Sequence, residues 1–234
     1  MLKPNFLIAL SVLSLGACRT LQMRDFHQEN QLKEPLPPLT LKVHGESFVG
    51  HFAAEMFQEG IQTGSVYGEP WILSPFSVYS QLGEPMRDVF TVLGNELNDN
   101  TTQKAGEKYG QARFKLVYYD RTQPGWGWII PSTLTIGGAN LFGMPATKIQ
   151  SNLELQMEIL DAGNKVIAQY RAPGSGKATV AMYYGYSGFG ARRKANLLAL
   201  QEAMRSIRHQ MEPDLAKINA DLQGSGPVNA PLNK

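Results

Sequence analysis

Cys18 is the only cysteine in the chain of 234 residues. A chain with one cysteine forms no internal disulfide, so its folded part must be held together by a packed apolar core. Residues 18–234 are enough for one sizeable domain or two small ones. Hydrophobic residues make up 43% of the chain and charged residues 18%, a balance typical of globular rather than disordered chains.

The residues before Cys18 are organised like an export signal. Lys3 supplies a positive charge, and an uncharged, mostly apolar stretch follows from residue 5 to residue 15. Two small residues, Gly16 and Ala17, then lead to the cysteine. This order is that of a secretory signal, and the apolar run is too short for a durable membrane span. The alternatives are an ordinary cleaved signal with an incidental cysteine, or a short buried apolar helix.

The sequence Leu15-Gly16-Ala17-Cys18 resembles a bacterial lipobox. The resemblance implies that residues 1–17 are removed as a signal peptide and that Cys18 is the lipidation site, acylated with palmitate-like chains. Two or more acyl chains anchor a protein stably, so a lipid bilayer is the first expected partner. Arg19 stands where the inner-membrane retention signal has Asp, which implies the periplasmic face of the cell outer membrane. A Gram-positive cell-surface lipoprotein is the alternative.

The polar residues after the cysteine are expected to form a tether. Residues 18–38 end in Pro35, Pro37 and Pro38, and proline favours extended backbone. An N-terminal arm packed on the domain is the alternative. The predicted domain occupies residues 39–222, and residues 223–234 are predicted to be a flexible tail.

Alternation of apolar and polar residues predicts five strands. In one of them, residues 112–120, the alternation places Phe114, Leu116 and Tyr118 on one face. In another, residues 151–160, Leu153 and Leu155 face one way. The predicted strands are 39–44, 112–120, 151–160, 165–171 and 177–184, and the apolar residues 71–73 are expected to form a further short strand.

Helices are predicted where apolar residues recur three and four apart, at 48–61, 84–97 and 191–211. Pro85 suits the first turn of the second helix. Pro213 should interrupt the third helix, after which Leu215, Ile218 and Leu222 continue its apolar face. The predicted fold class is α+β: a mixed or antiparallel sheet packed against helices, with a long C-terminal amphipathic helix.

An uncharged segment interrupts this pattern at residues 122–147. Its prolines and glycines disfavour a plain membrane-spanning helix. It is compatible with a buried strand–loop element, with an exposed apolar loop that docks on a partner or dips into the membrane, or with a hairpin of an oligomeric barrel. Trp is favoured at membrane interfaces and at binding hot spots. The residues expected to make such a contact are Trp126, Trp128, Ile129, Ile130, Leu141 and Phe142.

The sequence predicts no catalytic, cofactor-binding or metal-binding residue. With Cys18 acylated, no thiol remains for catalysis or for zinc. Gly174-Ser175-Gly176-Lys177 resembles the end of a phosphate-binding loop but lacks its first glycine and its hydroxyl residue, so a hairpin connection is the expected role. None of the histidines has metal-ligand spacing: His27, His44, His51 and His209.

Charged residues are expected to be solvated. Glu154 and Glu158 should share one strand face, and Arg192-Arg193-Lys194 should form a helix turn in solvent, with contact to a phosphate-rich surface as the alternative. The formal net charge is only +2, so no strong field favours nucleic acid as a partner.

The order of elements is similar to that of uncharacterised bacterial lipoproteins and, more loosely, of periplasmic assembly lipoproteins with a tolB-N or curli-secretion type domain. The residues that carry the resemblance are the lipobox, DVFTVLGNEL (88–97), ARFKLVYYD (112–120), EILDAGNKVIAQYR (158–171) and the final helix. The resemblance implies the lipid anchor and the type of domain. The first functional hypothesis is a non-enzymatic outer-membrane lipoprotein that binds or scaffolds an envelope protein, with candidate contacts in residues 124–145 and 197–222. The alternative is a subunit of an oligomeric secretion or transport assembly, with residues 122–147 inserted in the membrane.

Overall fold

The computed structural model describes residues 26, 32–52, 75–123, 145, 147–181 and 186–228, without the side chains of 75–84. Residues 45–52 are helical. The other elements, in chain order, are β1 (Leu39–Val43), α3 (Pro75–Asn95), a π-helical turn (Glu96–Thr101), β2 (Gly110–Thr122), β3 (Thr147–Asp161), β4 (Val166–Val180), α6 (Gly188–Met211), a 3₁₀ turn (Glu212–Asp214) and α7 (Leu215–Ser225).

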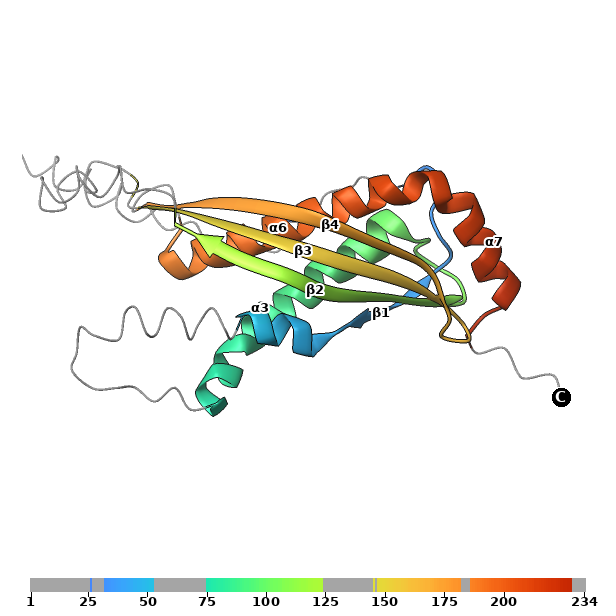
Figure 1. Ribbon diagram of the computed structural model, residues 1–234, viewed down its shortest axis with the longest axis horizontal. Helices are drawn as coiled ribbons and strands as arrows, with labels where there is room; N and C mark the ends of the chain where they lie inside the picture. The colour runs from blue at the N-terminus through green and yellow to red at the C-terminus, as the bar shows by residue number, and fades with distance from the viewer. Residues whose placement is uncertain are drawn as a thin grey trace, which may run out of the picture.

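The strands form one mixed sheet in the order β1-β2-β3-β4. β1 pairs parallel with β2, while β2, β3 and β4 pair antiparallel. α6 runs along one face of β3 and β4, and α3 packs beside α6 (Figure 1). The α+β class with a long C-terminal helix is therefore confirmed, and the sheet is mixed.

Alternation in β3 explains which sheet face is covered. From Ile149 to Ile159 its odd-numbered side chains point into the core, and its even-numbered side chains form the outer, polar face. The alternation ends at a register shift between Ile159 and Leu160. The apolar members of the inner set are Ile149, Leu153, Leu155, Met157 and Ile159. A strand with one apolar and one polar face is stable only when the apolar face is covered, which α6 does here.

The predicted face of β2 is correct for Phe114 and Leu116 but wrong for Tyr118. The register of β2 against β3 shifts between Leu116 and Tyr118. A bulge of this kind adds one residue and reverses the alternation beyond it. Tyr118 consequently lies on the outer face with 52% of its surface exposed, and Tyr119 takes the inner face.

β4 is one continuous strand, so the predicted break at Gly174-Ser175-Gly176-Lys177 is wrong. These residues pair in register with β3 from Leu153 to Gln150. The glycines serve helix packing instead of a turn. A Cβ atom on Gly174 would overlap the carbonyl oxygen of Ala199, and one on Gly176 would overlap that of Ala195.

A seam of small residues therefore joins β4 to α6. On the strand, Ala172 and Ala178 flank the two glycines on the buried face. On the helix, alanines recur every four residues and are buried: Ala191, Ala195, Ala199 and Ala203. Residues four apart lie on one helix face, so the seam brings the helix backbone directly onto the strand.

α6 also shields the open edge of β4. The backbone N–H of Ser175 donates to Glu202 Oε2 at 2.8 Å, and Gln210 Nε2 donates to the carbonyl oxygen of Arg171 at 3.2 Å. Pro173 has no N–H to offer. Lone edge strands invite pairing with other chains, and proline and charged residues are the usual protection.

The helix predicted at 84–97 begins earlier, at Pro75, so Pro85 lies inside α3 and not in its first turn. Val89 and Leu93 of this helix are buried, whereas Phe90 is 45% exposed. α3 is followed by the π-helical turn, which is closed by a bond from Thr102 N–H to the Leu97 carbonyl at 2.8 Å.

The C-terminal helices follow the prediction closely. The apolar residues that recur three and four apart in α6 are buried: Leu197, Leu200, Met204, Ile207 and Met211. Leu215, Ile218 and Leu222 of α7 are buried after the interruption at Pro213. The tail begins later than predicted, because α7 extends to Ser225 and the N–H of Val228 donates to the Lys108 carbonyl at 2.8 Å.

The described part of the predicted tether packs onto the domain. Phe26, Leu32 and Leu36 belong to the hydrophobic core. The N–H of Leu32 donates to Asn100 O, and that of Leu36 donates to Thr101 O, both at 3.0 Å. For these residues the packed arm, not the free tether, is correct. Among the described helices, none is long and apolar enough to cross a bilayer.

Candidate functional site

The residues predicted for lipidation and for partner contact lie outside the described part of the chain. These are Cys18, Trp126, Trp128, Ile129, Ile130, Leu141 and Phe142. The flanks of the uncharged segment are described. Thr122, at the end of β2, pairs with Gln150, and β3 begins at Thr147. Residues 123–146 therefore connect two neighbouring antiparallel strands, and both ends of the segment lie at one end of the sheet, called here the hairpin end.

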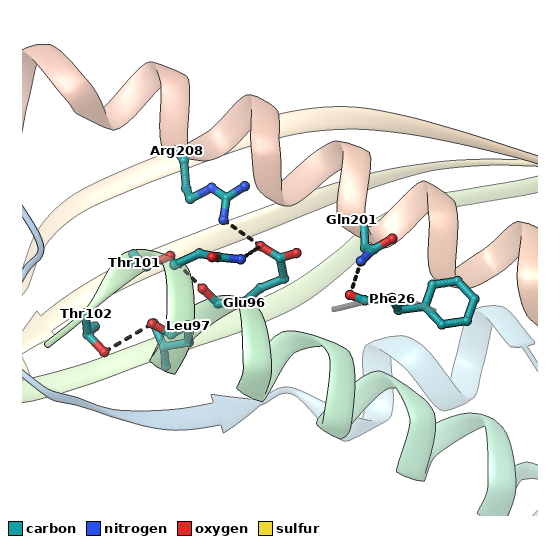
Figure 2. A network of polar contacts seen from close by, with 8 residues as sticks. Phe26, Glu96, Leu97, Thr101, Thr102, Gln201 and Arg208 are labelled. Atoms are coloured by element: carbon teal, nitrogen blue, oxygen red, sulfur yellow. Dashed lines mark hydrogen bonds and ion pairs between the residues drawn. The ribbon is translucent and has the colours of Figure 1, made fainter. Parts of the chain in front are cut away.

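A buried polar network joins the end of α3 to α6 (Figure 2). Arg208 Nη1 donates to Glu96 Oε2 at 2.6 Å, and Asn100 Nδ2 donates to the same oxygen at 3.0 Å. The ion-paired side chains of Arg208 and Glu96 are only 6% and 3% exposed. The π-helical turn places Glu96 and Asn100 on the side that faces α6.

Burial controls the ionisation of this pair. Desolvation raises the pKa of Glu96 above its ordinary value, although Arg208, Asn100 and Arg205 act in the opposite direction. Desolvation also lowers the pKa of Arg208, against the effect of Glu96. An ion pair removed from water is costly to form and more costly to break on one side only.

A second ion pair joins the same two helices nearer the hairpin end. Arg193 of α6 donates through Nε and Nη2 to both oxygens of Asp88 on α3, the Nη2 contact being 2.6 Å. The Asp88 side chain is 3% exposed. The bidentate pair Asp88–Arg193 and the pair Glu96–Arg208 together fix the position of α3 along α6.

The N-terminal arm is attached to α6 between these ion pairs. Gln201 Nε2 donates to the carbonyl oxygen of Phe26, and the Phe26 side chain is buried (Figure 2). A third polar contact, nearer the hairpin end, holds α6 to the sheet: Tyr119 Oη and Ser151 Oγ both lie within 2.8 Å of Asn196 Oδ1.

The other charged residues that the sequence singles out are engaged in the structure. Glu154 and Glu158 lie on the outer sheet face as predicted, paired with Arg171 and Arg113 of the neighbouring strands. Arg192-Arg193-Lys194 lies in the first turns of α6, but it is half-buried and not a solvated turn. Arg193 is bound to Asp88, and Lys194 Nζ lies 4.4 Å from the centre of the Tyr186 ring.

The described histidines take structural positions. The N–H of His44 donates to the Phe114 carbonyl, His51 lies in the helical residues 45–52, and His209 lies 3.4 Å from Glu212. His27 lies outside the described residues. In the described part of the chain, no group of three His, Cys, Asp or Glu side chains is placed to hold a metal ion.

Sequence reasoning missed the residues of the α3–α6 network. The bonded partners Glu96 and Arg208 are 112 residues apart, and Asp88 and Arg193 are 105 apart. Local periodicity carries no information about such pairs. One signal was present: a charged residue inside an apolar helical stripe, as Glu96 is between Leu93 and Leu97, indicates a buried partner.

The chemistry that this network offers is that of a clamp. Both oxygens of Asp88 and one of Glu96 accept charge-assisted hydrogen bonds from α6. The lone pairs of these carboxylate oxygens are therefore taken up by donors of α6. The arrangement holds α3 and the N-terminal arm on α6.

Comparisons with known proteins leave the chain without a family. No family model matches it, and no curated protein matches it. Among solved structures, it is similar to a candidate lipoprotein from Caulobacter crescentus CB15, with 14% identity and a TM-score of 0.32, over 58% of this chain and 82% of that one. A TM-score of this size does not establish a common fold or function.

Proposed function

We propose that the chain is a lipoprotein anchored through acylated Cys18 at the periplasmic face of the outer membrane, where it binds or scaffolds another envelope protein without catalysing a reaction. The support for the anchor is the order of charge, apolar run, small residues and single cysteine at residues 3–18. The clamp supports a binding role, since its acidic groups are committed to holding helices together.

The single observation that carries the partner contact is the topology around residues 122–147. The segment has no charged residue and joins two paired strands at one end of the sheet. A connection between neighbouring strands can vary without reordering the sheet, and such connections often carry function. We therefore assign the contact with the partner to Trp126, Trp128, Ile129, Ile130, Leu141 and Phe142.

The same topology favours a second candidate function, a subunit of an oligomeric secretion or transport assembly. If β2 and β3 continued beyond Thr122 and before Thr147, they would form an apolar hairpin. Hairpins from several copies could then build a closed barrel, the form in which strands cross a bilayer.

The test replaces residues 124–144 by a short Gly- and Asn-containing turn, which suits two antiparallel strands. Under the proposed function the variant keeps the thermal unfolding midpoint of the wild type, keeps its membrane anchor and loses its co-purifying protein. Unfolding of the variant would show instead that the segment belongs to the core.

Cys18→Ala in the otherwise intact chain provides the second arm. If the chain is a lipoprotein anchored only through Cys18, as first proposed, the variant is soluble and monomeric. A variant that stays in the membrane and migrates as an oligomer would overturn that proposal in favour of the inserted assembly, and removing residues 124–144 from it should then release it.

A further inference from the structure

The charges of the domain are unevenly distributed along its long axis. The hairpin end comprises residues 118–122, 147–152, 175–181 and 186–195, where the acidic residue is Asp120. Further carboxylates contact these ranges from outside them: Asp88 at Arg193 and Glu202 at Ser175. The basic residues there are Arg121, Lys148, Lys177, Arg192, Arg193 and Lys194. The two connections that leave this end, 123–146 and 182–185, carry no formal charge.

Pairing and packing place these ranges together. Lys177 pairs with Gln150 and Lys148 pairs with Thr179, so the two lysines are diagonal neighbours on the outer sheet face. On the inner face, Ala191 and Ala195 of α6 pack against Ile149 and Ala178. The first turns of α6 therefore lie beneath the same end of the sheet that carries the lysines.

Three of these basic side chains, all lysines, are not neutralised within the described part of the chain. Arg193 is bound to Asp88. Lys148 and Lys177 are exposed, and no described carboxylate lies within ion-pair distance of either. Lys194 contacts the ring and the hydroxyl of Tyr186, a contact that leaves its charge in place.

The opposite end, called here the turn end, has no such excess. It comprises residues 103–110, 159–167 and 211–225, where the basic residues Lys104, Lys108, Lys165 and Lys217 are mixed with the acidic residues Glu107, Asp161, Glu212, Asp214 and Asp221. Among the described residues of the two ends, the excess of basic residues therefore lies at the hairpin end. A charged surface orients such a molecule as well as attracting it.

We propose that the hairpin end is a docking surface for a bilayer with anionic phospholipid headgroups. The proposal rests on the membrane location in the proposed function and adds the orientation of the domain. Basic side chains next to an anionic leaflet bind it electrostatically. Phe189, at the start of α6, adds an apolar side chain that is 57% exposed, of the kind that enters the headgroup boundary.

The length of the arm is compatible with this orientation. Phe26 is fixed in the core beside Gln201, so Cys18 lies no more than about 29 Å from it along a fully extended chain of eight residues. Gln201 is 13 residues from Gly188, the first residue of α6, which corresponds to about 20 Å of helix. An anchor at Cys18 can therefore bring the hairpin end onto the membrane and cannot lift the domain far from it.

The test uses the mature chain from residue 18 with Cys18→Ser, so that no acyl anchor forms. Co-sedimentation is measured with vesicles of phosphatidylcholine alone and of phosphatidylcholine with phosphatidylglycerol at 7:3. The double variant Lys148→Glu/Lys177→Glu probes the hairpin end. The double variant Lys108→Glu/Lys217→Glu changes the net charge equally at the turn end and is the matched control. All four lysines are exposed, and unfolding midpoints verify the fold.

The Cys18→Ser chain should bind the anionic vesicles and not the neutral ones. The hairpin-end variant should bind at least about thirtyfold more weakly, from about fivefold for each lysine removed, and the turn-end control should stay within about twofold. Equal weakening in both double variants, equal binding to neutral vesicles, or no binding to anionic vesicles would each overturn the proposal. In the last case the acyl anchor of the intact lipoprotein is unaffected, so the failure is distinct from that of the proposed function.

Discussion

At the scale of single residues, the close packing of α6 on β4 depends on two glycines that carry a hydrogen atom in place of a side chain. Gly174 and Gly176 occupy positions where α6 leaves no room for a side chain. Overpacking in a close contact forces backbone shifts that typically cost about 1–3 kcal/mol. The glycines of this strand are therefore a requirement of helix packing, although in sequence they resemble a turn.

Gly176→Ala should lower the free energy of unfolding by about 1–3 kcal/mol, because its Cβ meets the backbone of α6. Gly224→Ala is the matched control: it lies in α7 with no atom near the added Cβ, and it should raise stability by up to about 1 kcal/mol. Urea titration of both variants measures the difference. Equal stability of the two variants would contradict the close contact.

At the scale of elements, the contact between α3 and α6 should depend on pH. Because the folded protein holds the pKa of Glu96 above its ordinary value of 4.5, the folded state binds this proton more tightly than the unfolded state does. The contribution of Glu96 to stability is then greatest below pH 4.5 and is lost as the pH rises through the folded pKa.

Glu96→Gln removes this titration and should flatten its part of the pH profile. We expect the free energy of unfolding of the wild type to fall relative to that of Glu96→Gln between pH 4 and pH 7, by about 1.4 kcal/mol for each unit by which the pKa is raised. Denaturant titrations at both pH values test this. If the free energy of unfolding of the wild type instead rises relative to that of Glu96→Gln over this interval, the attraction of Arg208 has a larger effect on the pKa of Glu96 than desolvation has.

At the scale of the whole molecule, the N-terminal arm belongs to the folded domain. Phe26, Leu32 and Leu36 are each less than a tenth exposed, and a fully buried large apolar side chain contributes about 1.5–3 kcal/mol. A chain that starts at residue 39 should therefore unfold at least about 10 °C below one that starts at Arg19, given about 2–4 °C for each kcal/mol in a domain of this size. Equal unfolding midpoints of the two chains in calorimetry would show instead that the residues before 39 form a free tether.

The sequence predicted those elements whose pattern is local. The stripe of α6 and the alternation of β3 are written in spacings of three, four and two residues, and the structure confirms them. It did not predict features that depend on a distant partner. The bulge before Tyr118 places this side chain on the face opposite to the predicted one. The glycines of β4 lie in a strand packed against α6 and not in the predicted turn. The pairs Glu96–Arg208 and Asp88–Arg193 join residues over a hundred positions apart.

If the proposed acyl anchor confines the protein to a membrane plane, the shielded edge of β4 has a further consequence. Molecules held in two dimensions meet far more often than the same molecules in solution, so a bare strand edge would soon recruit a second copy and then a third. With Glu202 and Gln210 occupying backbone groups of β4 and Pro173 withholding one, this side of the sheet terminates growth. A strand supplied by a partner would then add more readily beside β1, at the other edge of the sheet.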